Sequence, residues 1–189
     1  VGVLALQGAL RQHVRALGRL GADAREVRTP AELEGVAGLV LPGGESTTMD
    51  LLLGTSGLRE PIAAAIAGGL PVFGTCAGMI LLARELEDGV DGQRTFAALD
   101  IAVRRNGFGR QVASFEAPVA LEGEAEPMTG VFIRAPRITR VGEGVEVIGD
   151  LDGEPVVVQG GAIMAAAYHP ELTDDDRLHA RFLDSITSR

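Results

Sequence analysis

The segment Leu70–Ala83 constrains the fold of this chain more than any other stretch of its sequence. It opens with an apolar run that ends at Phe73, as buried parallel strands do, and Met79–Leu86 is rich in good helix formers. Between the two stands the pattern Gly-x-Cys-x-Gly, centred on Cys76. A nucleophile on a sharp turn from strand to helix needs glycines at those positions, because the two backbones nearly touch there. The segment therefore predicts an α/β fold with a parallel sheet and a reactive side chain at a strand end.

Cys76 allows two interpretations. A lone cysteine is most often a small buried apolar residue, and composition by itself favours that interpretation. The flanking glycines and the strand-to-helix context favour a nucleophile instead, which we expect to project from the sheet edge and to be exposed. The start of the following helix would direct free N–H groups at the sulfur, which favours the thiolate and offers a donor to an oxyanion.

The composition limits the chemistry that such a site can use. All 17 basic residues are arginines, so mechanisms that need a Schiff-base lysine or a phosphate-loop lysine are excluded. With one cysteine and three dispersed histidines, no metal centre is expected, and no feature of the sequence calls for a cofactor. The net charge of −9, with scattered arginines, argues against a nucleic-acid surface.

The length and the apolar pattern indicate how the chain is organised. Its 189 residues fit one domain, 1–189, which can bury a sizeable core without disulfides. No apolar stretch approaches the roughly 20 residues that a membrane span needs. The run Val1–Leu6 lacks the length and the basic flank of a signal peptide. We therefore expect a cytoplasmic protein without membrane contact, and the single cysteine agrees because it can form no intrachain disulfide.

The first half of the chain predicts alternating strands and helices, a pattern typical of a parallel sheet with right-handed crossovers. Its expected strands are Val1–Leu6, Ala24–Val27 and Gly38–Leu41. Its expected helices are one from Leu10 to Leu20 that Gly21 ends, one capped by Ser46 or Thr47 that runs to Leu53, and Leu58–Ala67.

After Leu86 the sequence changes to a polar loop and then to short strand-like segments, several of them expected to be antiparallel. Thr173 and Asp176 have the spacing of a capping box for a closing helix. The predicted fold class is thus α/β, a mixed and mostly parallel sheet flanked by helices. The expected strands are Ile101–Val103, Phe132–Ile133, Val145–Ile148, Val156–Val158 and Ala162–Tyr168, with hairpin turns at Leu151–Glu154 and Gly160–Gly161.

A cysteine nucleophile needs a base, and the end of the last expected strand offers His169 and Glu171. Residues two apart on a strand face the same side, so the carboxylate could hold the imidazole tautomer whose other nitrogen faces Cys76. The competing interpretation is a surface turn that carries a histidine and a glutamate by chance, which the presence of Cys76 disfavours. His13 and His179, on the first and last helices, are expected to be solvated or partly buried.

The segments Gly74–Gly78 and His169–Glu171 together resemble the class I glutamine amidotransferases. That resemblance implies a hydrolase that converts L-glutamine to L-glutamate and ammonia. More specific segments resemble the glutaminase subunits of pyridoxal 5'-phosphate synthase over essentially the whole chain, namely Leu4–Gly8, Leu41–Thr48, Arg105–Gln111, Phe115–Glu116 and Val131–Pro136. A loop near Glu87–Thr95 is the one departure from that resemblance, and no chemistry is expected to depend on it.

The resemblance implies a role for each site residue. Cys76 attacks the glutamine amide, His169 protonates the departing ammonia while Glu171 orients it, and water then hydrolyses the glutamyl thioester. The oxyanion is expected to lie against the backbone N–H groups of Gly44 and Ala77. The residues expected to hold the glutamine are Gly44, Glu45, Ser46, Arg105, Ile133 and Arg134.

The absence of lysine also bears on the partner. Building pyridoxal phosphate requires imine chemistry that a chain without lysine cannot supply. The resemblance implies a separate (β/α)8-barrel synthase subunit that receives the ammonia, in an assembly of twelve copies of each subunit.

Three alternatives stay open at this point: a glutaminase domain that serves another amidotransferase, a stress-related or protease-like member of the same fold, and a non-catalytic regulatory module. The second would place a histidine directly after the cysteine, where this chain has Ala77. The complete set of Cys76, His169 and Glu171 argues against the third.

Overall fold

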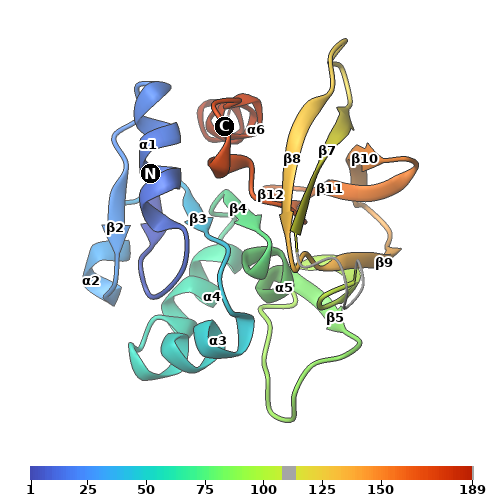
Figure 1. The fold of residues 1–189 in the computed structure, drawn as a ribbon. Coiled ribbons are helices and arrows are strands. Elements are labelled where there is room, and N and C mark those ends of the chain that lie inside the picture. Colours follow the sequence, from blue (N-terminus) through green and yellow to red (C-terminus); the bar gives the residue numbers. More distant parts are fainter. Residues whose placement is uncertain (108–113, 189) are drawn as a thin grey trace.

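A mixed β-sheet forms the centre of the molecule in a computed structural model that describes residues 1–107 and 114–188. Within these residues the large sheet has nine strands in the order β2-β1-β3-β4-β12-β11-β10-β7-β8, and a small sheet has the order β5-β6-β9 (Figure 1). The strands are β1 (Gly2–Leu4), β2 (Arg25–Val27), β3 (Leu39–Leu41), β4 (Val72–Thr75), β5 (Ala83–Leu86), β6 (Leu99–Arg104), β7 (Ser114–Leu121), β8 (Met128–Ile133), β9 (Arg137–Val141), β10 (Glu146–Leu151), β11 (Glu154–Gly160) and β12 (Ile163–Ala166). The helices are α1 (Leu10–Arg19), α2 (Pro30–Leu33), α3 (Ser46–Thr55), α4 (Arg59–Ala67), α5 (Ala77–Leu82) and α6 (Arg177–Thr187), with a 3₁₀ turn, η1 (Pro170–Leu172).

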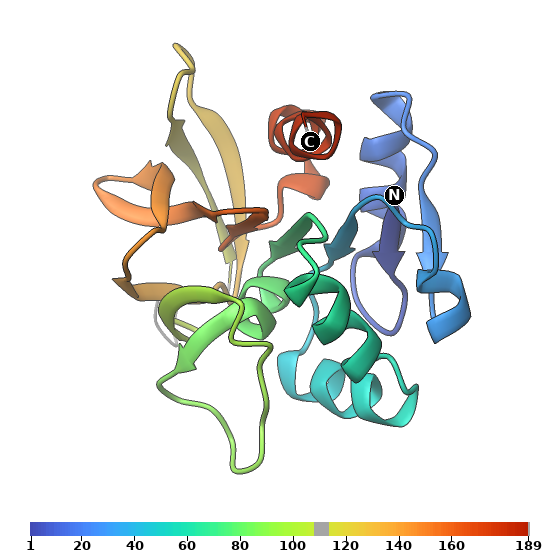
Figure 2. The same ribbon diagram turned by 180° about the vertical axis from the view of Figure 1, so that it is seen from behind.

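The large sheet has a parallel half and an antiparallel half. Neighbouring strands from β2 to β12 pair in parallel, whereas those from β12 to β8 pair antiparallel. Strands β1, β3, β4 and β12 are buried along their whole length, because helices cover both faces of the parallel half. Figures 1 and 2 show α1 and α6 on one side of these strands and α3, α4 and α5 on the other. The mixed α/β fold that the sequence predicts is confirmed.

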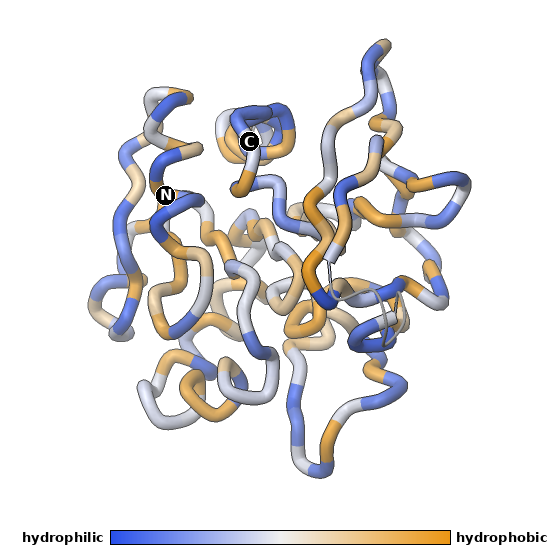
Figure 3. Tube along the Cα trace, in the orientation of Figure 1, coloured by the Kyte–Doolittle hydropathy of each residue, from blue (hydrophilic) through white to orange (hydrophobic). Residues whose placement is uncertain are grey.

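Helix α6 closes the core over the strands that carry the candidate site. The Phe73 ring of β4 packs against Phe182 of α6, with ring centroids 5.8 Å apart. A Cβ atom on Gly38, next to β3, would come within 2.5 Å of Ile186, so α6 lies directly on the backbone there. Apolar residues gather along the central strands, and polar ones follow the outer loops (Figure 3). None of the helices formed by residues 1–107 and 114–188 has both the length and the apolar character needed to cross a membrane.

The predicted hairpin turns form as expected. Asp152 and Gly153 have φ angles of 52° and 83°, as the two central residues of a type I′ turn do. Gly161, between β11 and β12, also has a positive φ. Helix α1 ends next to Gly21, whose φ is 79°.

Helix α5 is shorter than the sequence predicts. We expected a helix up to Leu86, but it ends at Leu82, where the backbone becomes extended and pairs with β6 as strand β5. Strands β7 and β9 are not among the strands that the sequence predicts. Pro118 interrupts the apolar alternation of β7, and most side chains of β9 are exposed, so neither segment has the pattern of a strand with one buried face.

Two predicted helix caps are wrong. The N-cap of α3 is Glu45 rather than Ser46 or Thr47, and α6 begins at Arg177 rather than near Thr173. The predicted capping box does not form, because the carboxylate of Asp176 binds the guanidinium of Arg19 on α1 instead, at 2.6 and 2.7 Å.

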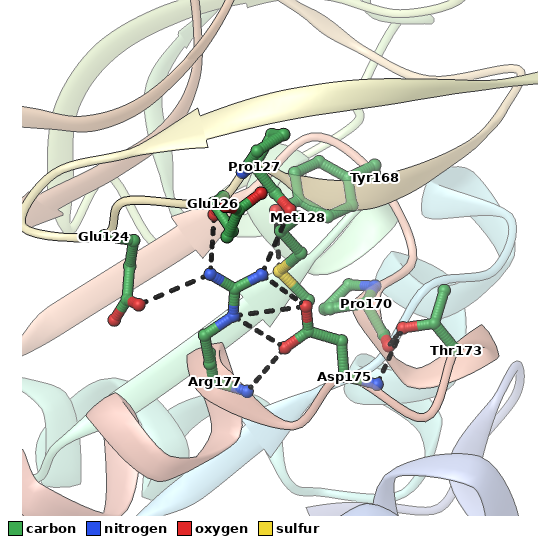
Figure 4. Close-up of polar contacts among 9 residues, drawn as sticks. All are labelled: Glu124, Glu126, Pro127, Met128, Tyr168, Pro170, Thr173, Asp175 and Arg177. Atoms are coloured by element: carbon green, nitrogen blue, oxygen red, sulfur yellow. Dashed lines mark hydrogen bonds and ion pairs between the residues drawn. The ribbon is translucent and has the colours of Figure 1, made fainter.

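Arg177 fastens the start of α6 to the turn between β7 and β8. Its guanidinium donates hydrogen bonds to the carbonyls of Glu126 and Pro127, at 2.8 and 3.2 Å, and pairs with Asp175 at 2.6 Å (Figure 4). The pKa of Asp175 is lowered, first by its hydrogen bonds from Arg177. The Thr173 hydroxyl donates to the carbonyl of Pro170 at 3.1 Å. Arg177 therefore joins the start of α6 both to Asp175, just before it, and to the turn between β7 and β8.

We predict that Gly78→Ala destabilises the fold. A Cβ atom at position 78 would lie 2.0 Å from the carbonyl oxygen of Leu41, so α5 and β3 would have to move apart. The expected loss is roughly 1–3 kcal/mol of unfolding free energy, as for other overpacked cores. Gly18→Ala is the matched control, because an exposed helix position with no atom within 4 Å should gain up to about 1 kcal/mol. Chemical denaturation of both variants checks this, and a Gly78→Ala protein as stable as the wild type would contradict it.

Candidate active site

Cys76 occupies a strained turn between β4 and α5. Its φ and ψ are 48° and −103°, a conformation that costs a residue with a side chain on the order of 1–3 kcal/mol. The turn is possible because residue 74 is a glycine. A Cβ atom at this position would lie only 2.8 Å from the carbonyl group of Gly78. The Cys76 N–H also donates to the carbonyl of Ala166, at 2.8 Å, which ties the turn to β12. The geometry is that of the turn that the sequence predicts around Cys76.

The exposure predicted for Cys76 is wrong. The residue is only 5% exposed, because its side chain lines a pocket rather than standing at an open sheet edge. The thiol lies 3.9 Å from the carbonyl oxygen of Ile133, at the end of β8.

His169 and Glu171 lie together, but not for the reason that the sequence suggests. Strand β12 ends at Ala166, so the alternation of side chains on a strand does not apply to them. The turn η1 places Glu171 instead, and its Oε1 lies 2.7 Å from Nδ1 of His169. The His169 N–H donates to the carbonyl of Val131 on β8 at 2.9 Å, which fixes the backbone of this residue.

The His169 ring is charged in this setting. Burial by itself would lower its pKa, but hydrogen bonds to Cys76 and Glu171 and the charge of Glu171 outweigh burial and raise the pKa of His169 to about 10. Burial likewise opposes ionisation of Glu171, yet the nearby His13 and the hydrogen bond with His169 lower the pKa of that carboxyl. The site therefore holds an imidazolium between the Glu171 carboxylate and the sulfur of Cys76.

The pocket encloses about 310 Å³ and brings together most of the predicted site residues. Two of them, Ala77 and Glu171, do not line it: Ala77 is the first residue of α5, and Glu171 lies behind His169. The predicted residues that line it are Gly44, Glu45, Ser46, Cys76, Arg105, Ile133, Arg134 and His169.

Gln7 also lines the pocket, although no role was predicted for it. Its side-chain oxygen accepts the N–H of Glu45 at 2.8 Å and so supports the loop after β3. Because the carboxyl ends of neighbouring parallel strands meet at one edge, the position of Gln7 shortly after β1 is the signal that could have identified it.

Glycines allow the loop after β3 to pass close to the site. A Cβ atom on Gly43 would lie 2.2 Å from Cε1 of His169, and one on Gly44 would lie 2.6 Å from the side-chain oxygen of Gln7. The carbonyl of Gly43 accepts the N–H of Ala9 at 3.2 Å, which sets the direction of the Gly43–Gly44 peptide.

Arg105 and Arg134 also line the pocket. Among the residues that the structure describes, Nε of Arg105 is buried without a hydrogen-bond partner, while its Nη1 lies 3.4 Å from the side-chain oxygen of Gln93. Arg134 has a φ of 45°, and the N–H of Gly107 donates to Ala135 at 3.0 Å, so the two loops are joined. The remainder of the predicted motif, Phe108–Gln111, lies outside the described residues.

His13 and His179 differ most from prediction. Both are fully buried rather than solvated, and Nδ1 of His13 lies 2.9 Å from Nε2 of His179. Nε2 of His13 lies 3.1 Å from the hydroxyl of Thr75 and 3.5 Å from Oε2 of Glu171. The amphipathic pattern of the helices could not reveal this contact, because it forms between α1 and α6, which are far apart in the sequence.

The chain is similar over nearly its whole length to proteins of a known family. The model of the SNO glutamine amidotransferase family matches residues 3–188. The pyridoxal 5'-phosphate synthase subunit PdxT of Salinispora tropica is 56% identical, over 98% of this chain and 96% of that protein. The protein of the same name from Corynebacterium jeikeium is 50% identical, over 100% of this chain and 97% of that protein.

Solved structures are also similar to this chain. A crystal structure of a glutamine amidotransferase superposes with a TM-score of 0.93 at 48% identity, over 98% of both chains. The structure of PurLQS from Thermotoga maritima superposes with a TM-score of 0.71 at 17% identity, over 97% of this chain and 96% of that chain. The second likeness is one of fold alone.

We predict that Glu45 stabilises α3 in a pH-dependent way. Partial burial opposes its ionisation, but hydrogen bonds from Thr47 and Thr48 outweigh burial and lower the pKa of Glu45 from 4.5 to about 2. The stabilisation is therefore complete above about pH 4.5 and is lost as the pH falls through 2. Glu45→Gln should cost about 1 kcal/mol at pH 7, and the difference from the wild type should shrink below pH 4.5.

Glu60→Gln is the matched control for this prediction, because Glu60 carries the same charge in the first turn of α4 without being its N-cap. Urea denaturation at several pH values measures both differences. An equal loss for the two variants would show that the charge alone, rather than the cap, acts at position 45.

Proposed function

This chain belongs to the SNO glutamine amidotransferase family, and on that premise we propose that it hydrolyses L-glutamine to L-glutamate and ammonia at Cys76. The observation that carries this proposal is the pocket that Cys76, His169 and Arg105 line together. A nucleophile, a base and a cation for a carboxylate are the groups that hydrolysis of an amino-acid side-chain amide requires.

The first half of the reaction forms a thioester. Because the pKa of His169 is about 10, the ring holds a proton at neutral pH beside the sulfur, and Glu171 occupies Nδ1, so Nε2 faces Cys76. The thiolate attacks the amide carbon, and the carbonyl electrons move to oxygen. Collapse of this intermediate breaks the C–N bond, and the nitrogen takes the proton from His169 as ammonia leaves.

The second half restores the enzyme. His169, now neutral, takes a proton from a water molecule as its oxygen attacks the thioester carbon. The C–S bond then breaks, glutamate leaves, and the site returns to a thiolate beside an imidazolium. Glu171 keeps the ring in one tautomer through both halves, so it contributes orientation and charge rather than a proton.

The oxyanion and the substrate have candidate partners around the sulfur. The N–H of Ala77, at the start of α5, and that of Gly44 are proposed as the oxyanion donors. The unpaired Nε of Arg105, in the described part of the chain, suits a substrate carboxylate. Glu45, Ser46, Ile133 and Arg134 complete the proposed glutamine site.

The ammonia is proposed to serve vitamin B6 biosynthesis. The relatives at 50–56% identity are named as subunits of pyridoxal 5'-phosphate synthase. The chain has no lysine for imine chemistry, so a separate subunit must build the cofactor. We assign that role to a (β/α)8-barrel synthase, joined to this glutaminase in a complex of twelve copies of each.

The alternatives from the sequence receive no support. The relatives give no indication of a glutaminase for another pathway. A stress-related or protease-like member is disfavoured by Ala77, and a non-catalytic module by the arrangement of Cys76, His169 and Glu171.

We predict that an electrophilic glutamine analogue, a diazoketone for example, labels this protein once and only at Cys76. This is the single thiol of the chain, and it lines the pocket. Cys76→Ser should fold normally, resist labelling and release no ammonia from glutamine. Mass spectrometry of the intact protein and of its peptides measures the labelling. Labelling at another residue, or a serine variant with wild-type turnover, would refute the assignment.

We also predict that the synthase accelerates this glutaminase. In a trans peptide, the C=O group and the following N–H group point in opposite directions. The hydrogen bond from the Ala9 N–H to the Gly43 carbonyl therefore directs the Gly44 N–H away from Ala9 in the free chain. If the partner turns this peptide, one oxyanion donor is gained, which is worth on the order of a hundredfold in kcat. Glutamate release with and without the synthase measures the gain, which should lie in kcat rather than KM. Equal turnover would exclude this form of control.

A further inference from the structure

A chain of buried side chains continues from the candidate active site into the core. It runs from His169 to Glu171, then to His13 on α1 and on to His179 on α6, with contacts of 2.7, 3.5 and 2.9 Å. The sequence and the proposed reaction give His13 and His179 no role. Both are fully buried and lie beside Phe73, with ring centroids 6.4 and 5.6 Å from it. Buried polar groups at such a position need a reason, because each must be paired to be tolerated.

The unpaired atoms among these four side chains decide which ring nitrogens of His13 and His179 carry protons. Oε2 of Glu171 and Nδ1 of His179 are buried and make no hydrogen bond to another residue within the described part of the chain. In one arrangement, Nε2 of His13 carries the proton and is shared between the Thr75 hydroxyl and Oε2 of Glu171. Nδ1 of His13 then accepts the proton that Nε2 of His179 carries. The one atom left without a partner among these side chains is then Nδ1 of His179, which carries only a lone pair.

The opposite arrangement is worse on two counts. If Nδ1 of His13 donated to His179, its Nε2 would turn a lone pair towards the Glu171 carboxylate, 3.5 Å away. His179 would then carry its own proton on Nδ1, a buried donor without an acceptor. An unsatisfied buried donor is costly, and so is a carboxylate oxygen that faces only a lone pair. Burial, the main cause, lowers the pKa of both His13 and His179, so both rings are neutral.

We propose that His13 is a positioning residue for glutamine hydrolysis. His179 holds the His13 ring in the tautomer that offers its Nε2–H to Oε2 of Glu171. This inference rests on the proposed function. A carboxylate held at one oxygen alone can rotate about its Cγ–Cδ bond and carry the bond to His169 with it. With a donor at each oxygen, the carboxylate plane is fixed, and so is the ring that faces Cys76. The 3.5 Å contact is long for a hydrogen bond, as is common in sites without substrate, and it is expected to shorten during turnover.

Two substitutions at position 13 separate the two nitrogens of the ring. The amide of His13→Asn reaches the place of Nδ1 and can still bond His179, but it stops short of Glu171. The amide of His13→Gln reaches the place of Nε2, so it can donate to Glu171. Both are neutral and polar, and each removes the ring. We expect kcat to fall roughly tenfold in the Asn variant with KM within about twofold, and the Gln variant to recover most of that loss.

A double-mutant cycle tests whether His13 acts through Glu171. In a Glu171→Gln background, His13→Asn should lower kcat by less than about twofold, because the carboxylate that it positions is gone. Glutamate release is measured with the synthase present, and thermal unfolding confirms that each variant is folded. The same fold-loss in both backgrounds, or a Gln variant as impaired as the Asn variant, would overturn the proposal.

The wild-type protein gives a test that does not depend on variants. Nitrogen-15 chemical shifts of the histidine rings distinguish a protonated from an unprotonated ring nitrogen. We expect Nε2 protonated and Nδ1 bare in both His13 and His179 at neutral pH, and the reverse tautomer in His13 would overturn the proposal. Loss of the proposed function itself would be seen separately, as wild-type protein that releases no glutamate or as undiminished release by Cys76→Ser.

Discussion

The contact between the backbones of β4, α5 and β3 is the constraint on which the site depends. These segments lie so close that neither Gly74 nor Gly78 could carry a side chain without moving them apart. The contact holds Cys76 in its strained conformation and directs the sulfur to the edge where the parallel strands end. Each loop that leaves this edge can then supply part of the pocket.

The two halves of the large sheet contribute different walls of the pocket. The parallel half supplies Cys76 after β4 and the glycine loop after β3, whereas β8 of the antiparallel half supplies Ile133 and leads into Arg134. The backbone N–H of His169 donates to the carbonyl of Val131 on β8, so the base is anchored to the half that does not carry the nucleophile. The distance between nucleophile and base therefore depends on how the whole sheet is assembled, and core packing sets it.

The sequence predicts the parts of this site that local geometry determines. Gly-x-Cys-x-Gly predicts the turn at Cys76 because only that backbone path needs glycines at both positions. Pairing of His169 with Glu171 was also predicted, although a 3₁₀ turn rather than a strand produces it. The burial of His13 and His179 could not be predicted, since it depends on how α1 packs against α6. Glu45 was assigned to substrate alone, because a glutamate is less common at an N-cap than the serine and threonines beside it.

The charge balance of the site explains why neutral histidines suit the position behind Glu171. The Glu171 carboxylate is buried, and its charge is one of the causes that raise the pKa of His169. A buried arginine at position 13 would satisfy Oε2 but would also repel the imidazolium, so it would lower the pKa of His169. A neutral Nε2–H satisfies the same oxygen and leaves the carboxylate charge available to His169. The buried lone pair on Nδ1 of His179 is a smaller cost than an unpaired charge would be.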